Sequence, residues 1–247
     1  MKYNIENCSG STESCVRAQS GGAYRIELCS ALEVGGLTPS YGLMKRAREA
    51  VTIKINAMIR PRCGDFLYSE REIAEMIEDI HVARVLKMDG VVFGCLTPKG
   101  QVDIPLMKRL MAECKGLDVT FHRAFDMCSD LSKALEDVIS VGCNRILSSG
   151  GAQTAPEGVD NLAKLVKQAD NRIIIMPGSG VNAGNIHTLL EITGAKEYHL
   201  SGMSIYDSGM VYRNPKINMG GTTLVDEYGT RMTDTAKIKA AVDAVNA

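Results

Sequence analysis

The chain lacks the features that would place it in a membrane or on nucleic acid. Its first eight residues hold no apolar stretch of the kind that a secretory signal needs, and no apolar run approaches the length that spans a bilayer. Lys and Arg total 28 against 29 Asp and Glu, a net charge of −1, so no broad attraction to nucleic acid or anionic lipid is expected. We therefore expect a cytoplasmic protein that binds neither nucleic acids nor membranes.

The cysteines lack the spacing of a disulfide framework. There are eight, at positions 8, 15, 29, 63, 95, 114, 128 and 143, and no two form a C-x-x-C pair. A chain of 247 residues is also far longer than a small disulfide scaffold. We therefore expect reduced thiols.

No glycine-rich fingerprint follows the first apolar run, which argues against the alternative fold, an open doubly wound sheet. What is present is a repeated unit, in which an apolar run ends in polar or Gly-rich residues and an amphipathic helical stretch follows. The predicted strands are 3–8, 24–29, 51–60, 90–96, 119–125, 145–149, 172–176 and 197–201. Eight such units in 247 residues predict an α/β chain folded as one TIM-type (β/α)8 barrel domain over residues 1–247.

The segment 203–233 departs from this repetition because it has no convincing periodicity and is rich in Gly, Asn, Asp and Tyr. We expect a long irregular segment here, followed by a last helix near 234–245. Irregular segments of this length are uncommon unless they are lids, oligomer contacts or disordered. The sequence does not choose among these three.

Charged side chains gather at the predicted strand ends, where barrel enzymes place their active sites. Alternation along strand 24–29 puts Arg25, Glu27 and Cys29 on one face, which we expect to point into the barrel. The candidate catalytic residues are Glu27, Arg60, His122, Arg123, Asp126 and His199. The alternative is a set of internal ion pairs that fix the loops, with Arg123 and Asp126 the clearest structural pair.

Small residues follow the seventh and eighth strands and leave backbone N–H groups free to hold an anion, as many barrels hold phosphate. An arginine at a strand end can grip a carboxylate or phosphate with two parallel hydrogen bonds. The predicted anion-binding residues are Arg60, Gly178, Ser179, Gly180, Ser201 and Gly202. Glycine-rich loops also serve merely to turn tightly, and that alternative stays open.

Two familiar chemistries are disfavoured by what the strand ends lack. No lysine stands at a catalytic end, as a Schiff-base aldolase requires, and no paired H-x-H supplies ligands for a metal hydrolase. Cys8 and Cys29 do end adjacent strands, so their sulfurs could share a soft metal such as Cu(I). The alternative is that they act as small hydrophobic residues.

The chain resembles the CutC family, named for copper homeostasis, from Cys8 to at least Asn218. The motifs that carry the resemblance are RIELCS (25–30), GGLTPS (35–40), MIRPR (58–62), GDFLYS (64–69), TFHRAFD (120–126) and MPG (176–178). It implies a TIM-type barrel, a cytoplasmic location, homo-oligomers and a Cu(I) site at Cys8 and Cys29. Two departures from the family pattern are Cys63, where a glycine is usual, and Tyr24, where an acid is common.

Two hypotheses follow, together with a simpler third. The first is a CutC-type copper homeostasis protein that binds Cu(I) through the thiolates of Cys8 and Cys29. The second is an enzyme doing acid–base chemistry on a small anionic, phosphorylated metabolite, with Glu27 or His122 moving a proton. The third is a binding or regulatory barrel without turnover.

Overall fold

The structure is a computed structural model that describes residues 3–219 and 226–247. Eight parallel strands form one sheet, in the hydrogen-bonded order β7-β6-β5-β4-β3-β2-β1-β8. They are β1 (Asn4–Ser9), β2 (Arg25–Leu28), β3 (Lys54–Met58), β4 (Gly90–Phe93), β5 (Asp118–Phe121), β6 (Arg145–Ser148), β7 (Ile174–Pro177) and β8 (Glu197–Leu200). β7 and β8 contact each other, so the barrel is nearly closed and the predicted fold class is confirmed.

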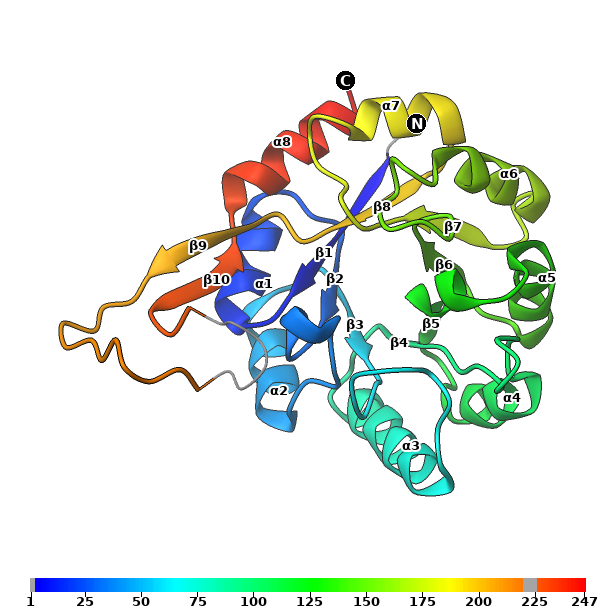
Figure 1. Ribbon diagram of the computed structural model, residues 1–247, viewed down its shortest axis with the longest axis horizontal. Coiled ribbons are helices and arrows are strands. Elements are labelled where there is room, and N and C mark those ends of the chain that lie inside the picture. The colour runs from blue at the N-terminus through cyan, green and yellow to red at the C-terminus, as the bar shows by residue number, and fades with distance from the viewer. Residues whose placement is uncertain (1–2, 220–225) are drawn as a thin grey trace.

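Helices surround the barrel on the outside (Figure 1). They are α1 (Thr12–Ser20), α2 (Tyr41–Ala50), α3 (Glu70–Val85), α4 (Ile104–Glu113), α5 (Leu131–Val141), α6 (Val159–Ala169), α7 (Ile186–Thr193) and α8 (Thr235–Val245). Two short 3-10 helices, η1 (Leu32–Val34) and η2 (Arg123–Met127), lie in the loops after β2 and β5. Local sequence explains the boundaries: Ser69 and Glu72 form a capping box at the start of α3, and Gly142 ends α5 with a left-handed backbone.

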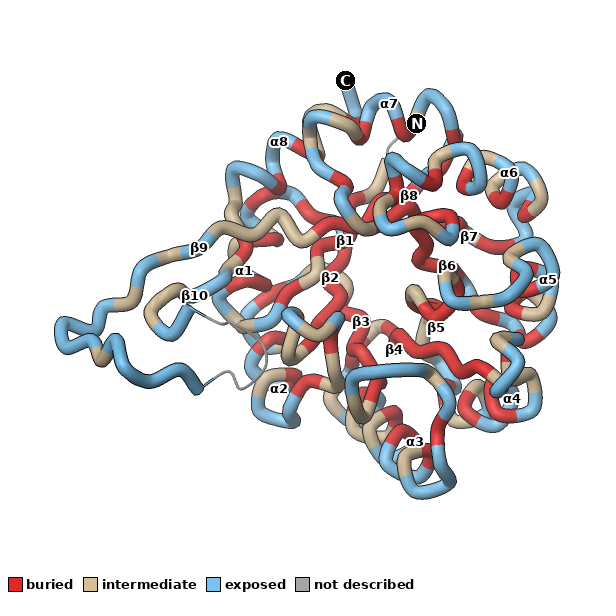
Figure 2. Tube along the Cα trace, in the orientation of Figure 1, coloured by how far each residue is buried: buried red, intermediate tan, exposed pale blue. Residues whose placement is uncertain are grey.

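Apolar side chains fill the layer between strands and helices, and Figure 2 shows buried residues along the whole ring of strands. The barrel interior holds buried charged groups beside a small apolar cluster. Arg25 pairs there with Glu6 and with Glu197, the latter at 2.5 Å, and Glu197 also accepts a hydrogen bond from Arg145 at 3.1 Å. The alternation along β2 therefore separates a charged inner face from an apolar outer face, as predicted.

The expectation of an irregular segment over 203–233 is wrong at both of its ends. Strands β9 (Met203–Asp207) and β10 (Gly229–Thr233) pair antiparallel and leave the barrel as a hairpin, which projects at the left of Figure 1. The pairing was missed because alternation over five residues on an exposed ribbon gives a weak hydrophobic signal. Residues 220–225 of this segment lie outside the described part.

In the part of the chain that the structure describes, the helices are too short or too polar to cross a bilayer.

Candidate functional site

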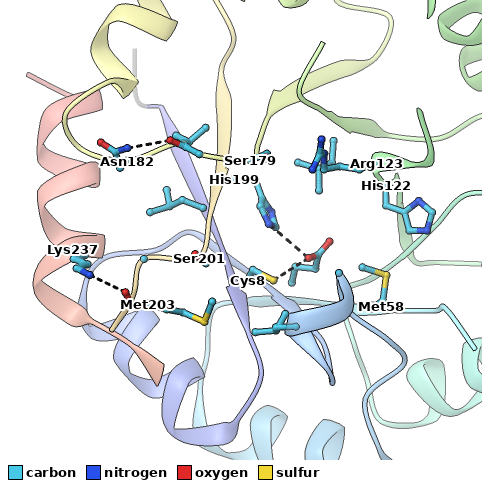
Figure 3. A pocket seen from close by; sticks show the side chains of 18 of the residues that line it. Cys8, Met58, His122, Arg123, Ser179, Asn182, His199, Ser201, Met203 and Lys237 are labelled. Atoms are coloured by element: carbon cyan, nitrogen blue, oxygen red, sulfur yellow. Dashed lines mark hydrogen bonds and ion pairs between the residues drawn. The ribbon is translucent and has the colours of Figure 1, made fainter. Parts of the chain in front are cut away.

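A cavity of about 710 Å³ opens at the carboxyl ends of the strands (Figure 3). Residues of every βα unit except the fourth contribute to its wall. The predicted site residues that line it are Cys8, Glu27, Arg60, His122, Arg123, Ser179, Gly180, His199, Ser201 and Gly202. Residues far apart in the sequence therefore meet in one place, as barrel topology requires.

The register of the sheet assembles one side of this cavity. Cys8 stands opposite Glu27 across β1 and β2, and Glu6 stands opposite His199 across β1 and β8. The sulfurs of Cys8 and Cys29 lie 3.4 and 3.5 Å from the same oxygen of Glu27, Oε2. His199 Nε2 lies 3.7 Å from that oxygen, and dashed lines in Figure 3 join Cys8 and His199 to it. We call Cys8, Glu27, Cys29 and His199 the thiol cluster.

The two thiols of the cluster differ in acidity. A hydrogen bond from Cys29 lowers the pKa of Cys8 most; burial opposes it, His199 and Glu27 add to it, and the result is about 5. The same interaction with Cys8, together with burial, raises the pKa of Cys29 well above its ordinary value. At neutral pH the pair therefore carries one negative charge, with Cys8 as the thiolate and Cys29 as the thiol.

Three further ionisable groups, Glu27, His199 and Glu6, contact one another next to the thiols. Burial raises the pKa of Glu27 well above its ordinary value, although His199 opposes this shift. Burial alone would lower the pKa of His199, but the acids Glu27 and Glu6 and the thiol of Cys8 raise it well above normal. His199 Nδ1 lies 2.8 Å from Glu6 Oε1. Burial favours a neutral Glu6, yet Arg25 and His199 hold its pKa far below the ordinary range.

Arg60 follows β3 at the wall of the cavity, and three of its five N–H groups already bind backbone carbonyls of the protein. Its Nη1 donates to the carbonyl oxygens of Val34 and Gly36, each at 3.1 Å, and its Nη2 donates to that of Gly64 at 3.0 Å. These bonds hold the two loops that flank the guanidinium. Of its five N–H groups, the one on Nε and the second one on Nη2 are left, and Nε is buried without a partner among the described residues.

His122 is a neutral imidazole in this structure. Its Nδ1 accepts a hydrogen bond from the Ala124 N–H at 3.2 Å, which caps η2 and assigns the ring proton to Nε2. Burial, and then the charge of Arg60, lowers the pKa of His122 to about 3. Its Nε2 is buried and finds no acceptor in the described residues.

The predicted pair Arg123 and Asp126 is formed, with Nε and Oδ2 2.8 Å apart. Asp126 also accepts hydrogen bonds from Ser148 Oγ at 2.6 Å and from the N–H groups of Ser149 and Gly151 at 3.0 and 3.1 Å. It does not line the cavity, whereas Arg123 does. Asp126, predicted as a catalytic candidate, thus fixes the loop after β6, and only Arg123 faces the space where a ligand would lie.

Only some of the predicted anion-binding residues face the cavity. Ser179, Gly180, Ser201 and Gly202 line the cavity. Gly178 does not, because it packs between neighbouring strands, where a Cβ would lie 2.4 Å from Leu147 Cδ1.

Sequence reasoning missed several contributors to the site. Glu6 supports His199 from inside the barrel, Met58 packs against Cys29, and Phe66 reaches the cavity from the long loop after β3. Alternation along β1 could have identified Glu6, since it lies two residues before Cys8 and on the same face. The position of Phe66 follows from the path of a loop, which no periodicity predicts.

One group of potential metal ligands stands out among the described residues. One ligand atom each from Cys8, Glu27 and His199 lies within 4.8 Å of the other two. Cys29 is outside this closest set, although its sulfur touches the same Glu27 oxygen. The predicted partners Cys8 and Cys29 are therefore neighbours, and an imidazole lies beside them.

Known proteins similar to this chain belong to the family that the motifs suggest. Residues 3–204 match the model of the CutC family. A protein named family protein CutC from Parabacteroides distasonis is 51% identical, with 98% of this chain and all of that protein covered. A human copper homeostasis protein cutC homolog is 47% identical over 96% of this chain and 87% of its own length. A CutC structure from Streptococcus agalactiae is 36% identical, with a TM-score of 0.77 over 80% of this chain and 97% of that one. The chain belongs to the CutC family.

Proposed function

We propose that this protein binds Cu(I) in copper homeostasis, through the sulfurs of Cys8 and Cys29 with the imidazole of His199. The observation that carries the proposal is the convergence of both sulfurs on one oxygen of Glu27, at 3.4 and 3.5 Å. Cu(I) is a soft ion that prefers thiolate, thioether and imidazole ligands. The name of the human relative supports the same role.

The chemistry of the donors fits such an ion. Cys8 carries a thiolate at neutral pH because its pKa is about 5, so one strong ligand needs no deprotonation. Met58, Val92 and Cys29 form a small apolar cluster against which Cys8 packs, and the sulfur of Cys29 is buried in it. Cys29 and His199 would each release a proton on binding, so affinity should rise with pH.

An anaerobic Cu(I) titration against a competing chelator of known affinity tests the proposal. Wild type and a Cys8→Ser/Cys29→Ser variant are compared with Cys63→Ser/Cys128→Ser, which removes one exposed and one partly buried thiol elsewhere. Loss of an outer-shell group alone costs about 10–100-fold in metal affinity, so we expect a larger loss in the first variant. The control should bind one equivalent as the wild type does. Equal affinity in both variants would refute the site.

We propose as a second candidate that the barrel is an enzyme acting on a small anionic metabolite. The observation in its favour is the cavity of about 710 Å³, which is far larger than a copper ion needs. Glu27, with its raised pKa and an Oε1 that has no partner in the described part of the chain, would donate or accept the proton.

Solvent deuterium exchange tests this second candidate. Metal-free protein is incubated in D₂O with a pool of small phosphorylated and carboxylated metabolites, and mass spectrometry follows C–H to C–D exchange. We expect exchange into a small number of metabolites that Glu27→Gln abolishes and the exposed control Glu33→Gln retains. Equal exchange with and without protein would rule out acid–base turnover on this pool.

Because homo-oligomers are implied by the family resemblance, we also propose that the protein assembles with copies of itself, which light scattering would test. A monomer at all concentrations would contradict this.

A further inference from the structure

Arg60 is a buried cation without an acidic partner. Its residue is 6% exposed, and no Asp or Glu oxygen within the described ranges lies within 4.0 Å of its guanidinium nitrogens. Arg25 and Arg145, which are 1% and 4% exposed, pair with Glu6 and Glu197. The carbonyl groups that Arg60 contacts carry no net charge. The wall of the cavity thus holds a positive charge that the surrounding protein does not neutralise, which is costly unless an anion binds there.

Two hydrogen-bond donors next to this charge are unused. Arg60 Nε–H is buried and has no acceptor among residues 3–219 and 226–247, and the same holds for His122 Nε2. Since His122 Nδ1 accepts the Ala124 N–H, the proton lies on Nε2 and makes it a donor. Leaving a buried donor unpaired costs about 1–3 kcal/mol. Two such donors in residues that line one cavity therefore point to an acceptor that the protein does not itself supply.

The two side chains also lie against the same aromatic ring, that of Phe66. The rings of His122 and Phe66 have their centroids 4.8 Å apart, and the guanidinium carbon of Arg60 lies 5.1 Å from the centre of the same Phe66 ring. Phe66 thus forms an apolar wall that both donors share. The charge of Arg60 is felt at the imidazole, whose pKa it helps to lower.

We propose that Arg60 Nε–H and His122 Nε2–H form a binding site for the carboxylate group of a small organic ligand. One positive charge and two donors match the charge and the two oxygens of a carboxylate. A phosphate has three free oxygens and up to two charges, and three of the four Nη N–H groups that would serve it already donate to backbone carbonyls. This inference rests on the second proposed function, for which it names the ligand class, and it is independent of copper.

The test needs a variant that removes the His122 Nε2–H donor but keeps the cap of η2. His122→Asn does this, because the asparagine Oδ1 can take the place of Nδ1 as acceptor for the Ala124 N–H while the Nε2–H donor is lost. His187→Asn is the matched control, since His187 lies exposed on α7. Thermal melting of each variant verifies that it is folded.

Binding is measured by NMR on metal-free protein, through the ring ¹⁵N resonances of His122 and the backbone amides. The probes are propionate, its neutral isostere propionamide, and inorganic phosphate. We expect propionate to bind saturably and shift the His122 Nε2 resonance, and to bind more tightly than the other two. A charge-assisted hydrogen bond is worth about tenfold or more in affinity. His122→Asn should therefore lower the affinity for propionate by at least that factor, whereas His187→Asn should leave it unchanged.

Three results would overturn the inference: propionamide that binds as tightly as propionate, phosphate that binds more tightly, or His122→Asn that binds propionate like the wild type. Propionate binding without any deuterium exchange would keep this site and refute the enzyme. Exchange that persists although propionate does not bind would refute this site alone.

Discussion

At the residue scale, Cys8 differs from the other cysteines because of its neighbours. The sulfur faces a second thiol, a carboxyl group and an imidazole, and these lower its pKa to about 5. Cys128, which is also partly exposed, has its pKa raised to about 12, chiefly by burial. The two thiols of similar accessibility should therefore react over different ranges of pH, since only the thiolate is nucleophilic.

We predict that alkylation of Cys8 by iodoacetamide is half-maximal near pH 5, whereas the rate at Cys128 still rises above pH 9. Mass spectrometry of tryptic peptides from the metal-free protein at pH 4 to 10 measures both rates. The Cys29 hydrogen bond is the largest single cause of the shift, and His199 adds a hydrogen bond and its charge, so Cys29→Ala and His199→Gln should each raise the midpoint of Cys8. A wild-type midpoint near 8.5, the value of an unperturbed thiol, would contradict this description of the cluster.

The sequence predicts part of this site, and the limit is physical. Alternation along a strand correctly places Glu27 and Cys29 on the interior face, because period-two geometry depends only on the local backbone. It cannot predict that the Nη atoms of Arg60 bind the carbonyls of Val34, Gly36 and Gly64, since those partners come from loops. The role of Arg60 therefore needs the tertiary structure.

At the element scale, Asp126 joins η2 to the loop after β6. It accepts hydrogen bonds from a hydroxyl and two N–H groups of that loop and pairs with Arg123. Its side chain is 6% exposed, so these charged hydrogen bonds are largely removed from water. The loop position, and with it the cavity wall at Arg123, depends on this carboxylate.

We predict that Asp126→Ala lowers the free energy of unfolding by about 3 kcal/mol, because several buried donors lose a charged acceptor together. Urea denaturation measures the change. The matched control is Asp65→Ala, whose side chain is 73% exposed and pairs with Arg62 at the surface, and it should have little effect. Equal losses in the two variants would mean that Asp126 does not hold the loop.

Gly158, just before α6, marks a second tight contact with the same loop. A Cβ at this position would lie 1.9 Å from the carbonyl oxygen of Ser149, which is backbone and cannot rotate away. We predict that Gly158→Ala costs about 1–3 kcal/mol of stability, as overpacking does, measured by urea denaturation. At Gly209 a Cβ would meet no atom of the described residues within 4 Å, so Gly209→Ala should leave stability unchanged. A stable Gly158→Ala protein would show that the loop can move aside.

The repeated units predict the eight barrel strands well, because each strand is buried against a helix and leaves a strong apolar signal. The hairpin of β9 and β10 is the exception. Its strands are partly exposed on both faces, and its register is fixed by pairing with a partner 22 residues or more away along the chain. Local pattern carries little information about such a pairing.

At the scale of the whole molecule, the barrel is held from inside by buried charges. Arg25, which is 1% exposed, pairs with Glu6 and Glu197, and Glu6 also supports His199 at the cavity. The site and the interior are therefore one electrostatic network. Removing one member leaves the others as unpaired buried charges. A substitution that changes the charges around His199 should therefore also change the stability of the barrel.

We predict that Glu6→Gln lowers the free energy of unfolding by about 3–5 kcal/mol at pH 7, as breaking a buried ion pair does. The pKa of Glu6 in the folded protein is lowered from the ordinary value of 4.5, so its stabilising contribution is present above that pH and is lost as pH falls below it. The difference between wild type and Glu6→Gln should then shrink below pH 4.5. Urea denaturation at pH 3 to 7 measures both, with the exposed Glu13→Gln as control. A difference that stays constant across this range would mean that Glu6 is not ionised in the folded barrel. His199 would then contact a neutral carboxyl group and not a carboxylate.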